Sequence, residues 1–392
     1  MSSKDCSVNN IYQLEGRVPL LKAIPFGLQH ILAMFVANLT PITIIAAAGG
    51  LSQAEIAVLL QNAMFIAGIA TLIQLYPVWK VGSGLPIVMG VSFTFVTVLC
   101  TVASNYGYPS VVGAVLVGGL FEGTLGLLAK YWRKLIAPVV AASVVIAIGM
   151  SLFSVGARSF GGGYAEDFGS AQNLLLGTIT LVVCLGWNCF AKGYLKQLSV
   201  LVGLLVGYVV AILMGKVDLS VIFAGGFVSL PKLMPYKPEF HAGAILSVCI
   251  IFLVSAAETI GDTTAMVATG LIMTGAGCMI LAGLLPPVGN FFASLPESVL
   301  GGCTIMMFGT IMTSGMQMLA KAGFNQRNVT IAALSLAVGV GFTAASEIDL
   351  WHIFPEIVQS VFSANVVAVA FVVSIILNLV LPKNMDVDKI SE

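Results

Sequence analysis

Residues 242–262 read AGAILSVCIIFLVSAAETIGD, and the apolar run that they open continues to Ala293 with only two charged residues, Glu258 and Asp262. About 20 consecutive apolar residues are enough for a helix to cross a lipid bilayer. The whole chain has the same character, since 58% of its 392 residues are hydrophobic, 9% are charged and the mean hydropathy is +1.03. A soluble domain carries about 25% charged residues. The sequence therefore predicts an integral membrane protein.

Twelve apolar segments have the length of membrane spans. A stretch with three prolines lies between the seventh and the eighth and predicts a linker. We divide the chain into an N-terminal segment (1–23), a first repeat of seven spans (24–215), the linker (216–240), a second repeat of five spans (241–382) and a tail (383–392). The predicted spans cover residues 24–48, 54–77, 85–103, 110–129, 135–155, 173–190, 195–215, 242–269, 271–293, 298–320, 329–345 and 364–381.

The basic residues predict the orientation of these spans. If the N-terminus is cytoplasmic, 13 of the 17 Lys and Arg residues fall in cytoplasmic stretches, which satisfies the positive-inside rule. Both termini are then expected on the cytoplasmic side of the cell membrane. The first 20 residues lack the apolar core of a signal peptide.

The two predicted repeats differ in length. Many transporters pair inverted repeats of equal length, and seven plus seven spans would make such a pair. The second repeat is shorter by about two spans with their connectors. At residues 268–271 two spans meet with almost no loop and without Lys or Arg. We therefore expect the missing pair of spans at Gly270–Leu271.

Polar side chains inside apolar spans are the first candidates for a functional site, because a charge at mid-bilayer costs at least about 2.5–3.5 kcal/mol. Glu258 lies well inside the eighth span, and Asp262 follows at i+4 on the same helix face. A carboxyl group there could bond a ligand or carry a proton, or it could be structural. Gln29 and His30 in the first span could line a site or only tie helices together.

The third span contains signals against an unbroken helix. Pro86 and Gly90 disfavour helix, and the β-branched residues between them favour extended backbone. Non-helical backbone at membrane depth is tolerated where it is buried or lines a cavity. A half-helix after such a break can present N–H groups to a ligand, with Ser92 and Phe93 at the break. Phe93 could stack on a flat ring.

Other kinds of chemistry find no support in the sequence. The seven cysteines and three histidines are scattered without metal-ligand or disulfide spacing, so no metal site is expected. No nucleotide-binding loop is present, and no set of nucleophile, base and orienting group predicts an enzyme. A net charge of zero argues against nucleic acid as a partner. We expect no cofactor.

The polar motifs resemble those of the nucleobase–ascorbate transporter family, the xanthine and uracil permeases. The similarity covers nearly the whole chain in order and is most specific at Gln29-His30 and at Glu258-Thr-Ile-Gly-Asp262. The other similar stretches are 25–35, 82–86, 90–95, 296–302 and 377–382.

The resemblance implies an all-α polytopic membrane protein with the 7+7 inverted-repeat transporter fold, arranged as core and gate domains. The third and tenth spans of this fold each combine a short strand with a half-helix. The base lies between them and is bonded by the eighth-span glutamate, which is Glu258 here. The resemblance places Ser92 and Phe93 at the third-span break and gives His30 a supporting role. It also suggests a homodimer.

One departure from the family pattern is large. The family's tenth-span signature is absent, and its ninth-span aspartate has no counterpart. We infer that spans nine and ten are missing, which would remove half of the paired-strand site and a carboxylate of the ion coupling. Transport could then be impaired.

The sequence thus predicts a secondary active transporter, a symporter that imports a purine nucleobase such as xanthine or urate (uric acid) with protons, or with sodium as the alternative ion. Three other functions stay open: a uracil permease, an anion carrier of the same fold, and a non-transporting membrane protein. Glu258 argues against the anion carrier, because a carboxylate repels anions.

Overall fold

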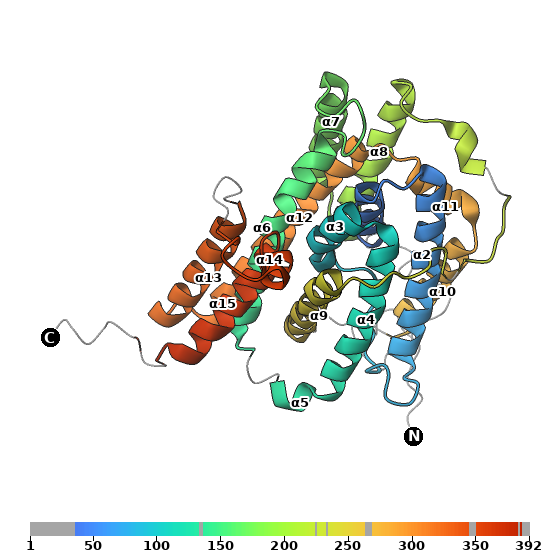
Figure 1. The fold of residues 1–392 in the computed structure, drawn as a ribbon. Coiled ribbons are helices and arrows are strands. Elements are labelled where there is room, and N and C mark those ends of the chain that lie inside the picture. Colours follow the sequence, from blue (N-terminus) through green and yellow to red (C-terminus); the bar gives the residue numbers. More distant parts are fainter. Residues whose placement is uncertain are drawn as a thin grey trace. The chain divides into compact units, whose positions relative to one another are not determined.

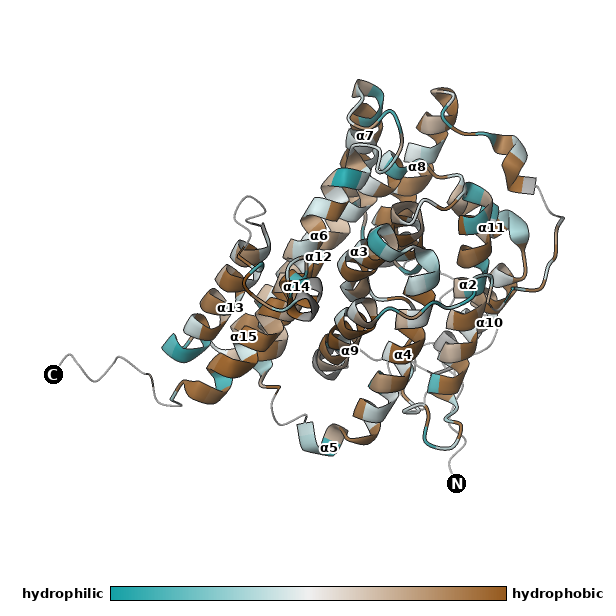
Figure 2. Cartoon of the chain, in the orientation of Figure 1, coloured by the Kyte–Doolittle hydropathy of each residue, from teal (hydrophilic) through white to brown (hydrophobic). Residues whose placement is uncertain are grey.

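The computed structural model describes residues 36–132, 136–223, 226–232, 234–262, 269–344, 350–382 and 385. The described residues are helical apart from their connections, and they contain one isolated bridge between Val78 and Val81 and no strand (Figure 1). Apolar residues line most of each helix, while hydrophilic residues gather at helix ends and connections (Figure 2). The predicted all-α polytopic class is confirmed.

Six of the described helices are long and apolar enough to cross a membrane, and a bent pair of helices could add a seventh span. Shorter apolar helices complete the set, among them one over Val36–Ala48. The labelled α-helices, which include these six spans, are α2 (Gln53–Leu75), α3 (Val96–Tyr106), α4 (Tyr108–Leu127), α5 (Ala129–Trp132), α6 (Pro138–Phe160), α7 (Ala171–Phe190), α8 (Ser199–Leu213), α9 (Ala242–Asp262), α10 (Thr269–Gly283), α11 (Pro286–Ala293), α12 (Glu297–Ala322), α13 (Gln326–Ala344), α14 (Glu356–Phe362) and α15 (Val366–Val380).

Two predicted spans are not single helices. The third, predicted over 85–103, is non-helical until Phe93, as Pro86 and Gly90 led us to expect. The ninth, predicted over 271–293, contains two helices, because α10 and α11 meet at a bend of 83°. Pro286 and Pro287 stand at the first positions of α11, where their missing N–H groups cannot continue α10.

The chain packs as two compact units. Unit 1 comprises residues 1–92, 158–235 and 264–306, and unit 2 comprises 93–157, 236–263 and 307–392. Each unit draws on both predicted repeats, so packing does not test the repeat boundaries, which stay a prediction. The boundary between the two units at Pro235 and Tyr236 falls inside the predicted linker.

In unit 1, α2 packs on α10 and α11, and α7 packs on α8. The start of α2 is a capping box: the Ser52 backbone N–H donates to Glu55 Oε2 at 2.9 Å, and the Ser52 hydroxyl caps the Glu55 N–H. The first turns of α12 approach α7 closely, since a Cβ at Gly302 would lie 2.5 Å from the Gly177 carbonyl oxygen.

In unit 2, α4 packs on α9, and α13 packs on α15. The α4–α9 contact centres on Phe252, whose ring lies directly against Gly118. At the end of α15, the Arg327 guanidinium donates to the Asn378 carbonyl oxygen at 2.6 Å. Such contacts bury the polar termini of the helices and leave apolar surface along their lengths.

Candidate functional site

The backbone over residues 85–92 forms no helix: the Ile87 N–H donates to the Leu85 carbonyl oxygen at 2.8 Å in a tight turn, and side chains from two helices of unit 1 hold the residues that follow. The Val91 N–H donates to Asn38 Oδ1 at 2.7 Å, and the Met89 N–H donates to the Thr71 hydroxyl at 2.9 Å. Asn38 and Thr71 are both buried. The two bonds engage alternate N–H groups of this segment.

The N–H groups of Val88 and Gly90 lie on either side of Met89 in the sequence. Neither makes a hydrogen bond within the part of the chain that the structure describes. Val88 is half-buried and Gly90 is exposed. Backbone N–H groups are strong donors, so these two are available to a ligand.

Immediately after this stretch, a single turn over Phe93–Phe95 opens α3 in unit 2. Its three side chains each contact a different partner. Phe93 packs edge-to-face on Phe308 with ring centroids 5.2 Å apart, and Phe95 packs on Phe252 at 4.7 Å. Between them, the Thr94 hydroxyl donates to Glu258 Oε2 at 2.6 Å.

The Thr94–Glu258 hydrogen bond is the central polar contact of unit 2. Thr94 is 2% exposed and Glu258 is half-buried in α9, one turn before the helix ends. A hydrogen bond to a carboxylate is short and about twice as strong as one between neutral groups. The bond therefore orients the Glu258 carboxylate and ties α9 to the start of α3.

The structure gives less detail for the other predicted site residues. Ser92 is half-buried and is the last residue of the non-helical stretch, directly before Phe93. Asp262 is the last residue of α9, and the structure does not describe its side chain. Gln29 and His30 lie outside the described residues. The structure thus bonds Glu258 to Thr94, in the turn that follows the third-span break, and the roles of all the predicted site residues stay predictions.

Three residues of this arrangement were missed by the sequence analysis: Asn38, Thr71 and Thr94. Each is a polar side chain inside an apolar span. Polar residues in spans are expensive and face the protein interior, so Asn38 carried a usable signal. Threonine gives a weaker signal, because its hydroxyl commonly bonds the carbonyl one turn back in its own helix, as Thr71 also does to Ala67 at 2.7 Å.

Comparison with known proteins decides the family. A family model described as "Permease family" matches residues 21–268 and 263–348 of this chain. Together the two matches cover most of the sequence. The chain belongs to this permease family. It is accordingly a membrane transporter and not an enzyme.

Named relatives of the permease share about a third of its residues. It is 30% identical to the xanthine permease XanQ of Escherichia coli (strain K12), over 95% of this chain and 94% of that protein. It is also 30% identical to the uric acid permease PucJ of Bacillus subtilis (strain 168), over 83% and 85% of the two chains. Among solved structures, the transmembrane domain of a cyanobacterium bicarbonate transporter, BicA, matches with a TM-score of 0.40 and 16% identity, covering 91% of the permease and 97% of that chain.

The comparisons also show how the permease differs in length. The alignment with XanQ runs over 439 positions and uses 95% of the 392 residues here, about 372, so about 67 aligned positions of that relative have no counterpart. The two matches to the family model meet at residues 263–268. About 67 residues correspond to two spans with connectors.

Proposed function

We propose that this permease imports a purine nucleobase, xanthine or urate, by proton symport across the cell membrane. The observation that carries the proposal is the Thr94–Glu258 hydrogen bond, which holds a carboxylate at the start of a broken span. Nucleobases present ring N–H groups that a carboxylate accepts and carbonyl groups that backbone N–H donors can bond. The names of the two relatives, a xanthine and a uric acid permease, support this class of substrate.

Within the proposal, Glu258 accepts from a ring N–H of the base. Ser92 lies at the break and tunes the choice between bases, and the ring of Phe93 contacts the plane of the base. Gln29 and His30 support the site from the first span. Asp262, one turn beyond Glu258, is the candidate for proton coupling. The permease is proposed to act as a homodimer.

A second candidate, a permease that binds a base without completing transport, is supported by the shorter length. The missing aligned positions and the meeting point of the two family matches at 263–268 agree with a loss of spans nine and ten. That loss would remove the second half-site and a coupling carboxylate. The two candidates share the base-binding residues and differ in whether the base crosses the membrane.

Uptake separates the two candidates. Radiolabelled xanthine, urate and uracil are offered to cells that lack their own base permeases and express either this chain or a version with two spans restored between Gly270 and Leu271. Uptake of xanthine or urate by the chain as it stands supports import. Uptake only by the restored version identifies the second candidate. Uptake of uracil alone, or of no base by either version, contradicts purine import.

The proposed orientation has its own test. Ile353 is 74% exposed in the connection between α13 and α14, which we place outside the cell. A membrane-impermeant thiol reagent should label an Ile353→Cys variant in intact cells. Labelling only in inverted vesicles would reverse the orientation and place both termini outside.

A further inference from the structure

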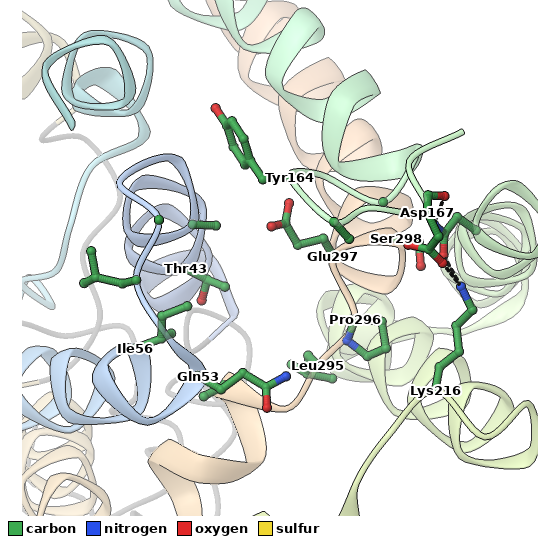
Figure 3. A pocket seen from close by; sticks show the side chains of 17 residues that line it. Thr43, Gln53, Ile56, Tyr164, Asp167, Lys216, Leu295, Pro296, Glu297 and Ser298 are labelled. Atoms are coloured by element: carbon green, nitrogen blue, oxygen red, sulfur yellow. Dashed lines mark hydrogen bonds and ion pairs between the residues drawn. The ribbon is translucent and has the colours of Figure 1, made fainter. Parts of the chain in front are cut away.

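Unit 1 contains a cavity of about 570 Å³ that shares no residue with the Thr94–Glu258 contact. It lies where four connections meet: the end of the first described helix, the α6–α7 connection, the end of α8, and the α11–α12 connection (Figure 3). All four were predicted on the outer side of the membrane. We call this cavity the end pocket. Its volume is in the range of small-molecule sites.

The carboxylate of Glu297, the first residue of α12, reaches into the end pocket and is held in place. The Tyr164 backbone N–H donates to it. A Cβ atom at Gly163 would overlap the carboxylate, so only glycine, with its φ of +69°, lets the α6–α7 connection lie this close. The carboxylate is thus fixed by backbone on one side and faces the cavity on the other (Figure 3).

The next residue, Ser298, lines the same pocket and is 1% exposed. Its hydroxyl oxygen is buried and makes no hydrogen bond within the described part of the chain. Burying a hydroxyl without a partner is unfavourable, and such groups call for an explanation. A ligand in the end pocket would supply the missing partner.

The lysine on the wall of the pocket is already engaged. Lys216 Nζ lies 2.6 Å from Asp167 Oδ2 and 2.6 Å from Asn173 Oδ1. The Asp167 carboxylate cancels its charge. Lys216 is the only Lys or Arg among the described residues that line the end pocket. An anionic ligand is therefore disfavoured. The described residues also contain no group of three metal-binding side chains, which disfavours a metal ion.

The groups that face the cavity match a neutral ring with N–H donors and carbonyl acceptors. Glu297 accepts, Ser298 can donate or accept, and Gln53 on the opposite wall offers both functions. Leu51, Ile56 and Leu295 line the pocket with apolar surface that suits the faces of a flat ring. The ligand class is the same as that of the proposed substrate.

We propose that the end pocket is a second nucleobase site, in which a ring N–H donates to Glu297 and the Ser298 hydroxyl bonds an adjacent ring group. This inference rests on the proposed function, because it takes the transported base as the ligand. The end pocket would bind the base at the membrane surface, apart from the Glu258 site.

Equilibrium binding of radiolabelled xanthine to the purified full chain tests the second site. Glu258→Gln removes the first site, and this variant should still bind about one equivalent. Adding Glu297→Gln should weaken the remaining binding at least tenfold. The matched control is Glu55→Gln, since Glu55 is an exposed carboxylate near the same end and a capping box also accepts glutamine; it should change nothing.

The outcomes separate the two hypotheses. Binding by the unaltered chain with none by the Glu258→Gln variant overturns the second site and leaves the proposed function standing. No binding and no uptake by the unaltered chain overturn both. Equal binding with and without Glu297→Gln places the residual site elsewhere and overturns the inference.

Ser298→Ala keeps the inference testable without altering charge. Because the hydroxyl has no described partner, the melting temperature of the ligand-free chain should not fall, while xanthine binding in the Glu258→Gln background should weaken about threefold or more. A lower melting temperature with unchanged binding would show that the hydroxyl has a structural role only.

Location is checked by labelling. Gln53 is exposed and lines the pocket, so a thiol reagent should modify Gln53→Cys. Xanthine should protect it in the Glu258→Gln background, whereas sulfate or sodium chloride should not. Protection by sulfate would mean an anion site, protection by sodium chloride alone would mean an ion site, and lack of protection by xanthine would mean no base there; each overturns the proposal.

Discussion

Two of the spans that the structure describes are broken, and the two breaks differ in the backbone N–H groups that they leave without a hydrogen bond. At 85–92 the non-helical backbone keeps its N–H groups except at Pro86, and those of Met89 and Val91 are bonded by side chains. At the α10–α11 bend, the chain turns through 83° and continues with two prolines, which have no N–H to leave unpaired. The carbonyl oxygen of Leu284 there accepts from the Ser229 N–H at 3.1 Å.

The difference teaches that a broken span is not by itself a binding site. At the α10–α11 bend the Leu284 carbonyl oxygen has a hydrogen-bond partner within the protein. The Asn290 side-chain amide also holds α11 in place by donating to the Ile222 carbonyl oxygen at 3.1 Å. The break at 85–92 instead exposes donors and is followed directly by the residue that bonds a carboxylate. A binding role is expected where a break keeps donors and has a charged group at its end.

The largest expected effect comes from removing that charge. Glu258→Gln should weaken xanthine binding at least about tenfold, since a tenfold change corresponds to about 1.4 kcal/mol and bonds to a charged group are the strong ones. The measurement is the dissociation constant of xanthine for the purified chain in the Glu297→Gln background, so that binding in the end pocket does not mask the change. Glu55→Gln is the matched control. Unchanged affinity of the Glu258→Gln variant would remove this carboxylate from the site.

The second prediction compares one amide at each break. Asn38→Leu removes the acceptor of the Val91 N–H, and Asn290→Leu removes the donor to the Ile222 carbonyl oxygen. Each change should lower stability by about 1 kcal/mol. Only Asn38→Leu should also weaken xanthine binding, by about fivefold. Melting temperature and dissociation constant are measured together; equal losses of affinity would show that the two breaks do not differ in function.

A smaller change is expected at Ser92. Ser92→Ala should shift the preference between xanthine and urate by about threefold, because one neutral hydrogen bond contributes about 1 kcal/mol or less. Competitive inhibition of uptake by the two bases measures the preference. Ser83→Ala, on the other side of Pro86, serves as control. Identical inhibition profiles for all three chains would place Ser92 outside the pocket.

The smallest effect concerns an exposed charge pair far from either break in sequence. The hydrogen bonds from Lys216 and Asn173 lower the pKa of Asp167 below its ordinary value of 3.8. The lowered pKa means that the folded protein binds the proton less readily, so the pair stabilises it above the ordinary pKa and ceases to do so as pH falls through the lowered value. Solvent screens the half-exposed carboxylate and limits the gain.

Asp167→Asn should therefore lower the melting temperature slightly at neutral pH. The difference from the unaltered chain should shrink as the pH falls below the ordinary pKa of aspartate and vanish below the lowered pKa of Asp167. Melting curves at several pH values in detergent measure it. A difference that grows in acid would contradict the sign of the pKa shift.

The sequence predicted the membrane class and the break at 85–92 because both follow from local chemistry. Apolar length decides the spans, and Pro86 with Gly90 decides the break. The bend at Pro286-Pro287 had the same kind of signal and was overlooked within a long apolar run. Glu258 stood out because a charge in an apolar span is rare.

Other parts of the site could not be predicted from local pattern. That Thr94 bonds Glu258 depends on how a turn in one span faces a helix 164 positions later. Asn38 and Thr71 become partners of Val91 and Met89 only once three segments pack together. The end pocket likewise forms only where four connections meet. The sequence around Gly163 and around Ser298 does not predict it.

The hydrogen bonds at alternate residues of 85–92 should determine how fast the amide protons there exchange with solvent. The amide protons of Met89 and Val91 are engaged by buried side chains and should exchange slowly with deuterium. Those of Val88 and Gly90 should exchange faster. A bound base that accepts from these two N–H groups would slow the exchange at Val88 and Gly90 alone. Amide exchange at alternate residues of this segment would therefore report whether a base is bound there.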